Sequence, residues 1–300
     1  MRVAVIINPV SGTHGHPEAA RQRAQLATKL LSAAHHAHEV HVTERGGHAY
    51  ELARSAIGRG ASLIVAWGGD GTMNEVGRAV AFSDATLGLI PAGSGNGLAR
   101  ELQVPMQPEQ AFATVLRMSD RTIDVGEING RFFFNAAGVG FDAHVGWLFN
   151  NRPGGRRGML PYVTIAAREL FTYKSPEYVV TADGETVRLR ALLIAFANSR
   201  QYGNGAIIAP AARLDDGKLT LVIVKERSPL ATMWEARRLF SGALERSPGV
   251  TIRQVAQVTI TAEQPLRFHV DGEPVNEECT TLTVRVHPRA LRVRGSGTPV

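Results

Sequence analysis

Short apolar runs alternate with segments of helical periodicity through the first third of this 300-residue chain. The runs have the length of single strands, and the helical segments carry apolar residues three or four positions apart. Strands that alternate with helices build parallel sheets. The expected strands are residues 2–7, 39–43, 62–67 and 87–90, and the expected helices are residues 17–31, 48–57 and 72–82. The alternation therefore predicts an α/β domain with a parallel sheet.

The turn at residues 68–75, Gly-Gly-Asp-Gly-Thr-Met-Asn-Glu, lies between a predicted strand and a predicted helix. Glycine adopts positive φ and allows another group close to the backbone. The free N–H groups at a helix start favour phosphate. Asp70 would repel a phosphate unless a cation lay between them, so the turn predicts a Mg²⁺–nucleotide site. The alternative is an ordinary glycine-rich turn, which would not need the aspartate.

Polar or glycine-rich loops follow each of the four predicted strands. Ligands of parallel sheets bind beyond the carboxyl ends of the strands, so these loops predict a phosphate cradle. The Walker pattern is absent, and Leu98 occupies the position where the dinucleotide-binding pattern needs its third glycine. The loops are residues 8–12, Thr43, residues 68–72 and residues 93–97.

The pattern changes after about residue 120, where helical crossovers give way to hairpins. Asn129-Gly130 and Asp183-Gly184 are typical hairpin turns. The β-type segments predict an antiparallel second domain, interrupted by helices near residues 162–171 and 230–244. The expected strands are residues 122–128, 131–136, 178–181, 186–197, 218–224, 257–261, 266–270 and 282–286.

Composition narrows the cellular setting and the partners. A net charge of +6 favours anionic partners, and the sequence has no nucleic-acid-binding signature, so a nucleic-acid partner is not expected. No apolar stretch is long enough to span a membrane, and the start does not resemble a secretory signal. The single Cys279 cannot form an internal disulfide, which suits a reducing compartment. We therefore expect a cytoplasmic protein.

Several motifs together resemble the bacterial diacylglycerol kinase family, which is related to eukaryotic diacylglycerol and sphingosine kinases. A GGDGT turn alone would also be found in NAD kinases and phosphofructokinases, but the ordered set is more specific and runs through nearly the whole chain. The motifs are NPVSG at 8–12, GGDGTMNE at 68–75, PAGSGNGLAR at 91–100, NAAGVGFD at 135–142, YGNGAIIAP at 202–210, LDDGKL at 214–219 and VDGE at 270–273.

The resemblance implies two domains. Residues 1–125 would form a Rossmann-like nucleotide-binding catalytic domain of the NAD-kinase and phosphofructokinase type, joined by a return strand within 288–300. Residues 126–287 would form a β-rich antiparallel lipid-binding domain.

The resemblance also implies roles for single residues. The ATP contacts would fall on Asn8, Pro9, Ser11, Gly12, Thr43, Gly68, Gly69, Asp70, Gly71, Thr72, Asn74 and Ser94. A structural Mg²⁺ would be held by Asp216 with the carbonyls of Arg213 and Lys218, an oxygen-only set that suits a hard cation. The residues around Asp216 could instead be a solvated turn. Glu273 matches the general base, although an acid in a turn is usually only exposed.

The implied reaction transfers the γ-phosphate of ATP to a lipid hydroxyl, as in the conversion of diacylglycerol to phosphatidic acid. Glu273 would accept the hydroxyl proton, and Asp70 would hold Mg²⁺ or its waters against the phosphates. Two alternatives remain open: a soluble-substrate kinase such as an NAD kinase, and a nucleotide-regulated lipid-binding protein without catalysis. The acceptor lipid is undetermined, and some family members form homodimers.

A lipid kinase must also touch the anionic membrane that holds its acceptor, transiently and at the inner surface. Residues 230–246 combine apolar and basic side chains, as do helices that lie in membrane interfaces. The alternative is a helix that packs its apolar side on its own domain. Arg152, Arg156 and Arg157 could meet anionic head groups, or could belong to a solvated loop.

Overall fold

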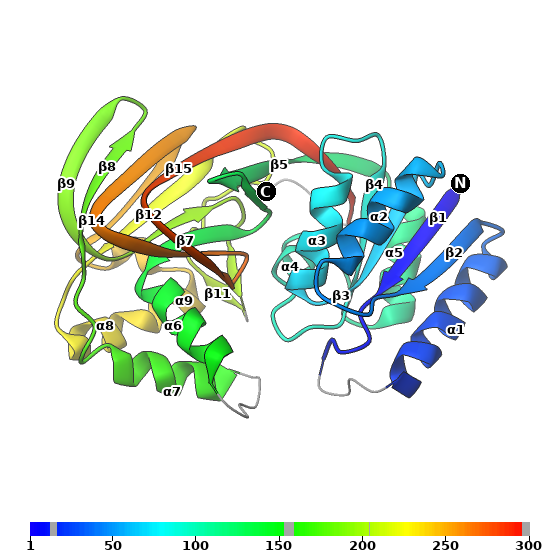
Figure 1. The fold of residues 1–300 in the computed structure, drawn as a ribbon, viewed down its shortest axis with the longest axis horizontal. Coiled ribbons are helices and arrows are strands. Elements are labelled where there is room, and N and C mark those ends of the chain that lie inside the picture. Colours follow the sequence, from blue (N-terminus) through cyan, green and yellow to red (C-terminus); the bar gives the residue numbers. More distant parts are fainter. Residues whose placement is uncertain (13–16, 153–158, 204, 296–300) are drawn as a thin grey trace. The chain divides into compact units, whose positions relative to one another are not determined.

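The computed structural model describes residues 1–12, 17–152, 159–203 and 205–295. The chain divides into two compact units, one of residues 1–125 with the segment from residue 289 onward, and one of residues 126–288. The boundaries expected from the sequence were 125/126 and 287/288. Figure 1 shows the course of the chain through both units.

The first unit is built on a parallel sheet in the order β2-β1-β3-β4. The strands β1, β3 and β4 are almost wholly buried, which explains their continuous apolar sequences. The parallel pairing agrees with the alternation in the sequence. The strands are β1 (Arg2–Ile7), β2 (Ala37–Val42), β3 (Leu63–Gly68) and β4 (Thr86–Pro91).

A fifth parallel strand comes from the end of the chain. Arg292 of β15 (Glu273–Arg294) pairs with Thr86 of β4, which confirms the expected return strand. The buried carboxylate of Asp124 accepts a hydrogen bond from the backbone N–H of Arg289 at 2.7 Å and anchors this return.

Helices cover the sheet of the first unit. Among them, α3 begins at Asp70 and not at Thr72, because Gly69 is its N-cap residue. The short α4 and the longer α5 were not predicted; α5 packs on β4, and its Phe112 ring packs against Trp67 of β3. The helices are α1 (Pro17–Ala33), α2 (His48–Gly58), α3 (Asp70–Val80), α4 (Gly97–Glu101) and α5 (Pro108–Arg117).

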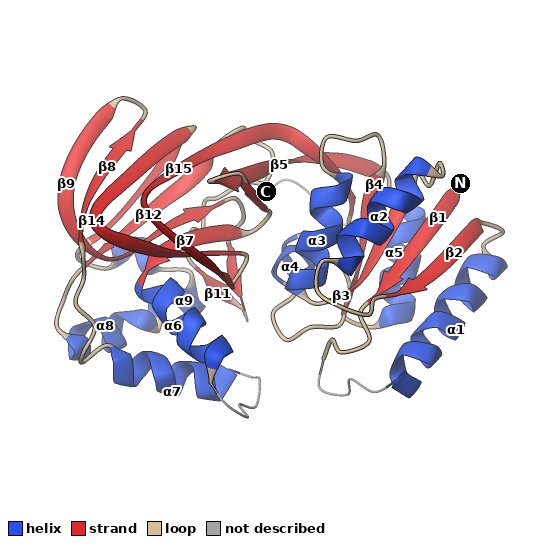
Figure 2. Ribbon diagram, in the orientation of Figure 1, coloured by secondary structure: helices blue, strands red, loops and turns tan. Residues whose placement is uncertain are grey.

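The second unit is dominated by antiparallel strands, as Figure 2 shows. Two strands expected at 257–261 and 266–270 are one long strand, β14. The strands expected near 282–286 and 289–294 are likewise both parts of β15. The strands are β5 (Asp120–Ile128), β6 (Arg131–Phe133), β7 (Ala136–Gly140), β8 (Glu177–Ala182), β9 (Glu185–Ala197), β10 (Gln201–Gly203), β11 (Ala206–Ile207), β12 (Leu219–Lys225), β13 (Val250–Val255) and β14 (Gln257–Val270).

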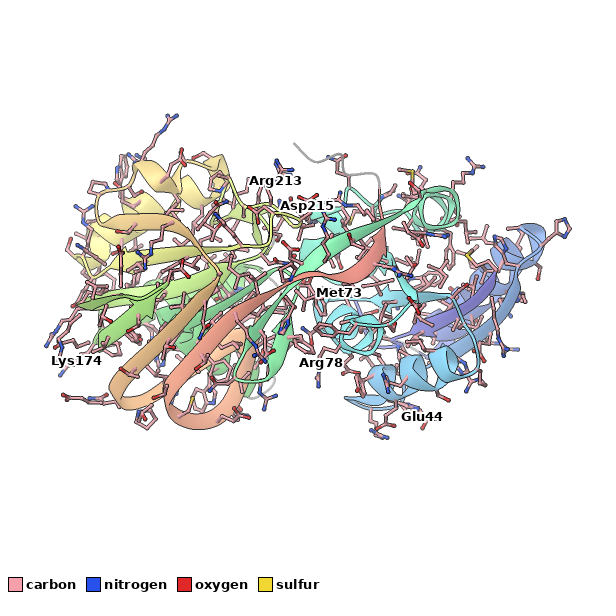
Figure 3. The ribbon with its side chains drawn as sticks, turned by 90° about the horizontal axis from the view of Figure 1, so that it is seen from above. Glu44, Met73, Arg78, Lys174, Arg213 and Asp215 are labelled. Atoms are coloured by element: carbon pink, nitrogen blue, oxygen red, sulfur yellow. The ribbon has the colours of Figure 1, made fainter. Side chains whose placement is uncertain are left out.

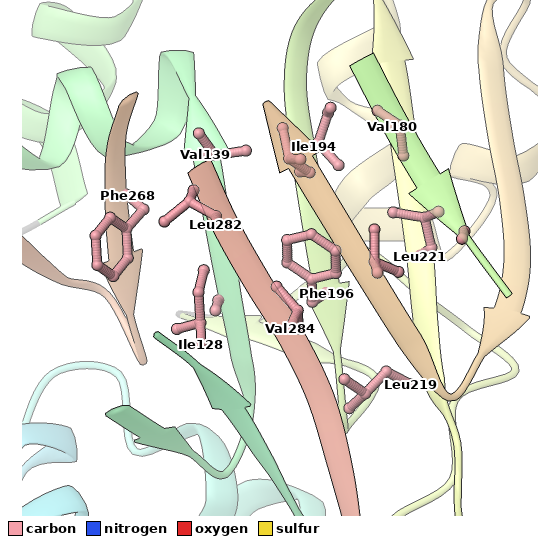
Figure 4. Packing of buried hydrophobic residues seen from close by; sticks show 14 of the residues in the cluster. Ile128, Val139, Val180, Ile194, Phe196, Leu219, Leu221, Phe268, Leu282 and Val284 are labelled. Carbon is pink, nitrogen blue, oxygen red and sulfur yellow. The ribbon is translucent and has the colours of Figure 1, made fainter. Parts of the chain in front are cut away.

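One hydrophobic cluster forms the core of the second unit. Phe196 of β9 packs with Leu282 and Val284 of β15, and the cluster extends to Phe268 of β14 (Figure 4). All four side chains are buried, so the strands that carry them are held in one register.

The helices of the second unit interrupt the strands. The helix expected at 230–244 is divided into α8, α9 and a 3₁₀ turn, and Gly242 ends α9 in a left-handed conformation. Helix α6 was not predicted. Within the described part of the chain, no helix has the length and apolar character needed to cross a bilayer. The helices are α6 (Phe141–Asn151), α7 (Met159–Glu169), α8 (Pro229–Ala236), α9 (Arg238–Ser241) and η1 (Leu244–Arg246).

Candidate active site

Asp70 holds two glycine-rich loops together. Its Oδ2 accepts a hydrogen bond from the backbone N–H of Asn96 at 2.8 Å, and its Oδ1 accepts one from Gly97 at 2.7 Å. A β-carbon at Gly95 would lie 2.5 Å from Oδ2, so the loop can approach the carboxylate only with glycine there. Asp70 therefore has a structural role at the edge of the sheet, whatever else it binds.

The side chain of Asn96 closes the second loop on itself. Its Oδ1 accepts from the N–H of Gly93 at 2.9 Å, and its Nδ2 donates to the carbonyl of the same residue at 2.7 Å. Asn96 adopts a positive φ of 54° and is the N-cap residue of α4. A β-carbon at Gly93 would lie 2.6 Å from the α-carbon of Gly69, so the two loops touch through their glycines.

The first loop joins the same edge through a side-chain contact. Asn8 donates from Nδ2 to the hydroxyl of Thr72 at 2.8 Å, although 64 residues separate them. Ser11 donates to the carbonyl of Asn8 at 2.9 Å. Three of the four loops expected to form a phosphate cradle, at 8–12, 68–72 and 93–97, are therefore in direct contact. Thr43 is buried beside them and donates its N–H to the carbonyl of Ile7 at 2.8 Å.

A positive charge supports the first loop. Arg23 of α1 donates to the carbonyl and hydroxyl oxygens of Ser11 at 3.0 and 2.8 Å, and to the carbonyl of Asn8 at 2.9 Å. Burial lowers the pKa of Arg23, but a guanidinium keeps its charge at neutral pH. The sequence analysis missed Arg23, since only the tertiary structure brings α1 beside this loop.

Glu75 was also missed as an organising residue. From α3, its carboxylate accepts hydrogen bonds from the N–H groups of Gly47 at 2.9 Å and Ala49 at 3.0 Å, at the start of α2. A carboxylate at this position accepts hydrogen bonds from N–H groups that have no partner within the helix. The positive end of the helix dipole also stabilises its negative charge. Glu75 is the last residue of the 68–75 motif, and its place in that motif was the only sign in the sequence that it has a role.

The carboxylate of Asp70 could also take part in binding Mg²⁺ and ATP. Each oxygen of Asp70 keeps a second lone pair after accepting one N–H, so the carboxylate can still accept hydrogen bonds from metal-bound water. The pocket beneath the loops has a volume of about 10 Å³, which suits a single water. This pocket is too small for a nucleotide.

In the second unit, Asp271 organises the turn that carries Glu273. Its carboxylate accepts hydrogen bonds from the backbone N–H groups of residues 134, 135 and 136, at 2.8 to 3.2 Å. Asp271 and Gly272 both have positive φ, the conformation of a type I′ turn. Glu273 is exposed at the start of β15, and Asn150 of α6 donates to its Oε2 at 3.4 Å.

A buried polar cluster lies behind this turn. His269 Nε2 lies 3.0 Å from Asp142 Oδ2 and 3.1 Å from the hydroxyl of Tyr202, which also donates to Asp142. The Nδ1 atom accepts from the N–H of Gly272 at 3.3 Å, so the ring proton belongs on Nε2. Burial by itself would raise the pKa of Asp142, but the interactions of its carboxylate with His269 and Tyr202 are stronger, so the pKa is lowered. The same burial, with the Asp142 charge, raises the pKa of Tyr202.

The residues predicted to hold a structural Mg²⁺ lie in the turn before β12. Asp216 Oδ1 accepts from the N–H of Lys218 at 3.0 Å, and Oδ2 accepts from Gln254 at 2.8 Å. Arg213 forms an ion pair with Asp215 at 3.5 Å, and Figure 3 labels both side chains. One carboxylate and backbone carbonyls suit a hard cation, and each oxygen of Asp216, like those of Asp70, keeps a second lone pair after accepting one N–H. No group of three His, Cys, Asp or Glu side chains gathers around a common point in the described ranges.

The predicted residues thus fall in three places. The ATP residues lie along the loops of the first unit, whereas Glu273 and the Asp216 turn belong to the second. Of the three arginines expected to face lipid, Arg156 and Arg157 lie outside the described residues. Arg152 stacks on the ring of Phe149, 4.2 Å from its centroid.

Two family descriptions cover most of the chain. Residues 2–128 match the diacylglycerol kinase catalytic domain, and residues 135–295 match the YegS C-terminal NAD kinase beta sandwich-like domain.

Individual proteins support the same relationship. A protein of Chromohalobacter salexigens named "Probable lipid kinase YegS-like" is 33% identical over 83% of this chain and 81% of its own length. A protein of Bacillus subtilis named diacylglycerol kinase is 28% identical over 91% of this chain and 89% of its own. The crystal structure of a diacylglycerol kinase from Bacillus anthracis has a TM-score of 0.75 at 21% identity, covering 100% of this chain and 98% of that one, and it supports the fold.

Proposed function

Because the chain belongs to the diacylglycerol kinase family of lipid kinases, we propose that it transfers the γ-phosphoryl group of ATP to the hydroxyl of diacylglycerol or a related lipid alcohol. The enzyme is a phosphotransferase with an alcohol acceptor. The observation that carries the proposal is the contact between the three loops at the carboxyl edge of the parallel sheet: Asp70 joins the 68–72 and 93–97 loops, and Asn8 joins the 8–12 loop to Thr72.

In the proposed reaction, the lipid hydroxyl oxygen attacks the γ-phosphorus as the bond to the β–γ bridging oxygen breaks, and ADP leaves. Glu273 accepts the hydroxyl proton. The loop N–H groups and Arg23 stabilise negative charge on the phosphates, in agreement with the electrostatic demands of phosphoryl transfer. Bound Mg²⁺ would neutralise further charge, with Asp70 accepting hydrogen bonds from its waters. Mg²⁺ at the Asp216 turn is a second, structural proposal.

The role of Glu273 is supported by its position in a turn with two independent anchors. The three N–H bonds to Asp271 hold one side of the turn, and the Gly272–His269 bond holds the other. A general base must lie within hydrogen-bond reach of the hydroxyl, and a turn anchored on both sides holds the carboxylate in one place. The domain roles proposed from this are nucleotide binding for the first unit and lipid binding for the second.

The direct test measures transfer of label from γ-labelled ATP with Mg²⁺. The acceptors are diacylglycerol, ceramide, sphingosine and phosphatidylglycerol in mixed micelles, with NAD⁺ in a separate reaction. Label in a lipid product supports the proposal, whereas label only with NAD⁺ contradicts it and favours an NAD-kinase-like activity. Tight lipid binding without transfer under any condition would favour a non-catalytic lipid-binding protein.

Glu273→Gln tests the base. General-base assistance is worth about 10²–10⁴ in rate, so turnover should fall at least about 10²-fold while nucleotide affinity stays unchanged. The matched control is Glu277→Gln on the same strand, since Glu277 is exposed and pairs with Arg131. Near-normal turnover in Glu273→Gln would remove this residue from the mechanism.

We further propose a cytoplasmic enzyme that meets the inner membrane transiently. The homodimer that some relatives form remains a prediction for this chain, and sedimentation velocity would test it.

A further inference from the structure

Helix α8 is amphipathic with its apolar side turned outward. Leu230, Met233 and Trp234 recur at the spacing of one helix face, and their exposed fractions are 72%, 43% and 61%. No residue of this helix is buried. A helix of a globular protein normally buries such a face. The alternative considered for this segment, a helix that packs its apolar side on its own domain, therefore fails for α8.

The polar side of the same helix points inward. Glu235 accepts a hydrogen bond from the buried Ser247 at 2.6 Å and pairs with Arg238 at 3.1 Å. The side chains of Glu235 and Arg238 are only 18% and 30% exposed. The orientation of α8 is thus held by polar contacts with its own unit, and rotation to bury the apolar face would break them.

The two apolar residues of α9, after α8, have different surroundings. Leu239 packs with the buried Leu244 against the strands, whereas Phe240 is 58% exposed. Phe240 thus adds a fourth exposed apolar side chain to this part of the surface. Figures 1 and 2 show α8 and α9 on the outside of the β-rich unit.

Positive charge accompanies the apolar face. Arg237 continues the spacing of Leu230, Met233 and Trp234, and its guanidinium lies 3.1 Å from the centroid of the Trp234 ring. Residues 225–246 contain five Lys or Arg and three Glu, an excess of two positive charges. One glutamate, Glu235, is already paired. The surface therefore combines apolar side chains that can enter an acyl layer with cations that suit anionic head groups.

We propose that Leu230, Met233, Trp234 and Phe240 with Arg237, which we call the α8 face, dock the enzyme on an anionic lipid bilayer. The lipid partner is chosen because the charged residue that continues this apolar face is Arg237, whereas Glu235, the acidic residue of α8, points inward to Ser247 and Arg238. The inference rests on the proposed function only for the expectation that the acceptor lies in a bilayer. Tryptophan beside arginine is typical of the boundary between head groups and acyl chains.

The test measures binding to vesicles without nucleotide. Vesicles of equal parts phosphatidylglycerol and phosphatidylcholine should sediment with the protein, and Leu230→Ser with Trp234→Ser should weaken that partition at least about tenfold, because each side chain buries a large apolar area. The control is Val187→Ser, an exposed apolar residue of β9 in the same unit, which should leave binding unchanged. Equal binding of the double variant and the wild type would overturn the proposal.

A second measurement follows Trp234 itself without altering the face. In a Trp147→Phe protein the remaining tryptophans are Trp67, which is buried, and Trp234. Anionic vesicles should shift its emission to shorter wavelength, because the indole leaves water. An unshifted spectrum with bound vesicles would place the contact elsewhere and overturn the proposal. So would a self-association that the double variant abolishes, since a second copy would then cover the face.

Catalysis separates this inference from the proposed function. On a water-soluble, short-chain diacylglycerol the double variant should retain wild-type turnover, whereas on vesicles its activity should fall with its binding. A wild-type protein that binds vesicles but transfers no phosphate to any lipid would contradict the proposed function and leave the docking surface standing. Equal loss of activity on the soluble and the vesicle substrates would contradict the docking role.

Discussion

Asp70→Asn should destabilise the first unit even when no nucleotide or metal is present. In the native protein the carboxylate accepts two backbone N–H bonds, from Asn96 and Gly97, one on each oxygen. Asparagine keeps one acceptor oxygen, and its side-chain NH₂ group faces the second of these two backbone N–H groups. One N–H then loses its acceptor, a loss of about 1–3 kcal/mol for a charge-assisted hydrogen bond.

The magnitude can be read from urea unfolding in the presence of EDTA. With a dependence of roughly 2 kcal/mol per molar urea, the midpoint should fall by about 0.5–1.5 M. Trp67 is a local reporter, because it is 2% exposed and directly precedes the 68–75 turn. Replacing Trp147 and Trp234 by phenylalanine, both in the other unit, leaves Trp67 as the single tryptophan.

The control is Asp84→Asn in the same unit. The side chain of Asp84 is 99% exposed and pairs with Arg292 at the surface, so its midpoint should stay that of the wild type. A wild-type midpoint for Asp70→Asn would refute the reasoning, since it would show that the two N–H bonds contribute nothing and that any role of Asp70 lies in metal binding alone.

Three further outcomes are expected. Asp271→Asn should lower the thermal unfolding temperature and also reduce turnover, because the carboxylate that accepts three backbone N–H bonds before Glu273 becomes a neutral amide, a weaker acceptor; unchanged turnover would separate the turn from catalysis. Tyr202→Phe removes a hydrogen bond that lowers the pKa of Asp142, so its acid unfolding should begin at higher pH than in the wild type; an identical acid transition would contradict this. Burial opposes the ionisation of Glu127, but His287 and Arg285 prevail and lower its pKa. A carboxylate with a depressed folded pKa stabilises the protein above its unfolded pKa, near 4.3, and this stabilisation is lost as pH falls through the folded value. Melting temperatures measured against pH should therefore decline less steeply on acidification in Glu127→Gln.

Much of the fold was predictable because its signals are local. The strands β1, β3 and β4 are continuous apolar runs, and each is buried on both faces of a parallel sheet. The hairpin at Asn129-Gly130 follows from two residues that readily adopt positive φ, and both do so here. Such features depend on a few neighbouring residues, which a sequence pattern records directly.

Other elements escaped because their cause is not local. The long strand β14 contains polar residues between its two apolar parts, and its pairing with β15 changes register between Thr261 and Leu266, so the sequence pattern there indicates two strands. Helix α6 is mostly apolar, so its sequence lacks a clear polar side.

By itself, the sequence determined the kinds of group at the candidate site: glycines where loops approach closely, Asp70 at a helix start, and Glu273 in a turn. Only the tertiary structure decided their partners. Asp70 meets Asn96 and Gly97 across 26 and 27 residues, and Asn8 meets Thr72 across 64. The same holds for the outward direction of the α8 face. Pattern and spacing report how a side chain relates to its own helix or strand, whereas its hydrogen-bond partners and exposure depend on segments brought together by folding.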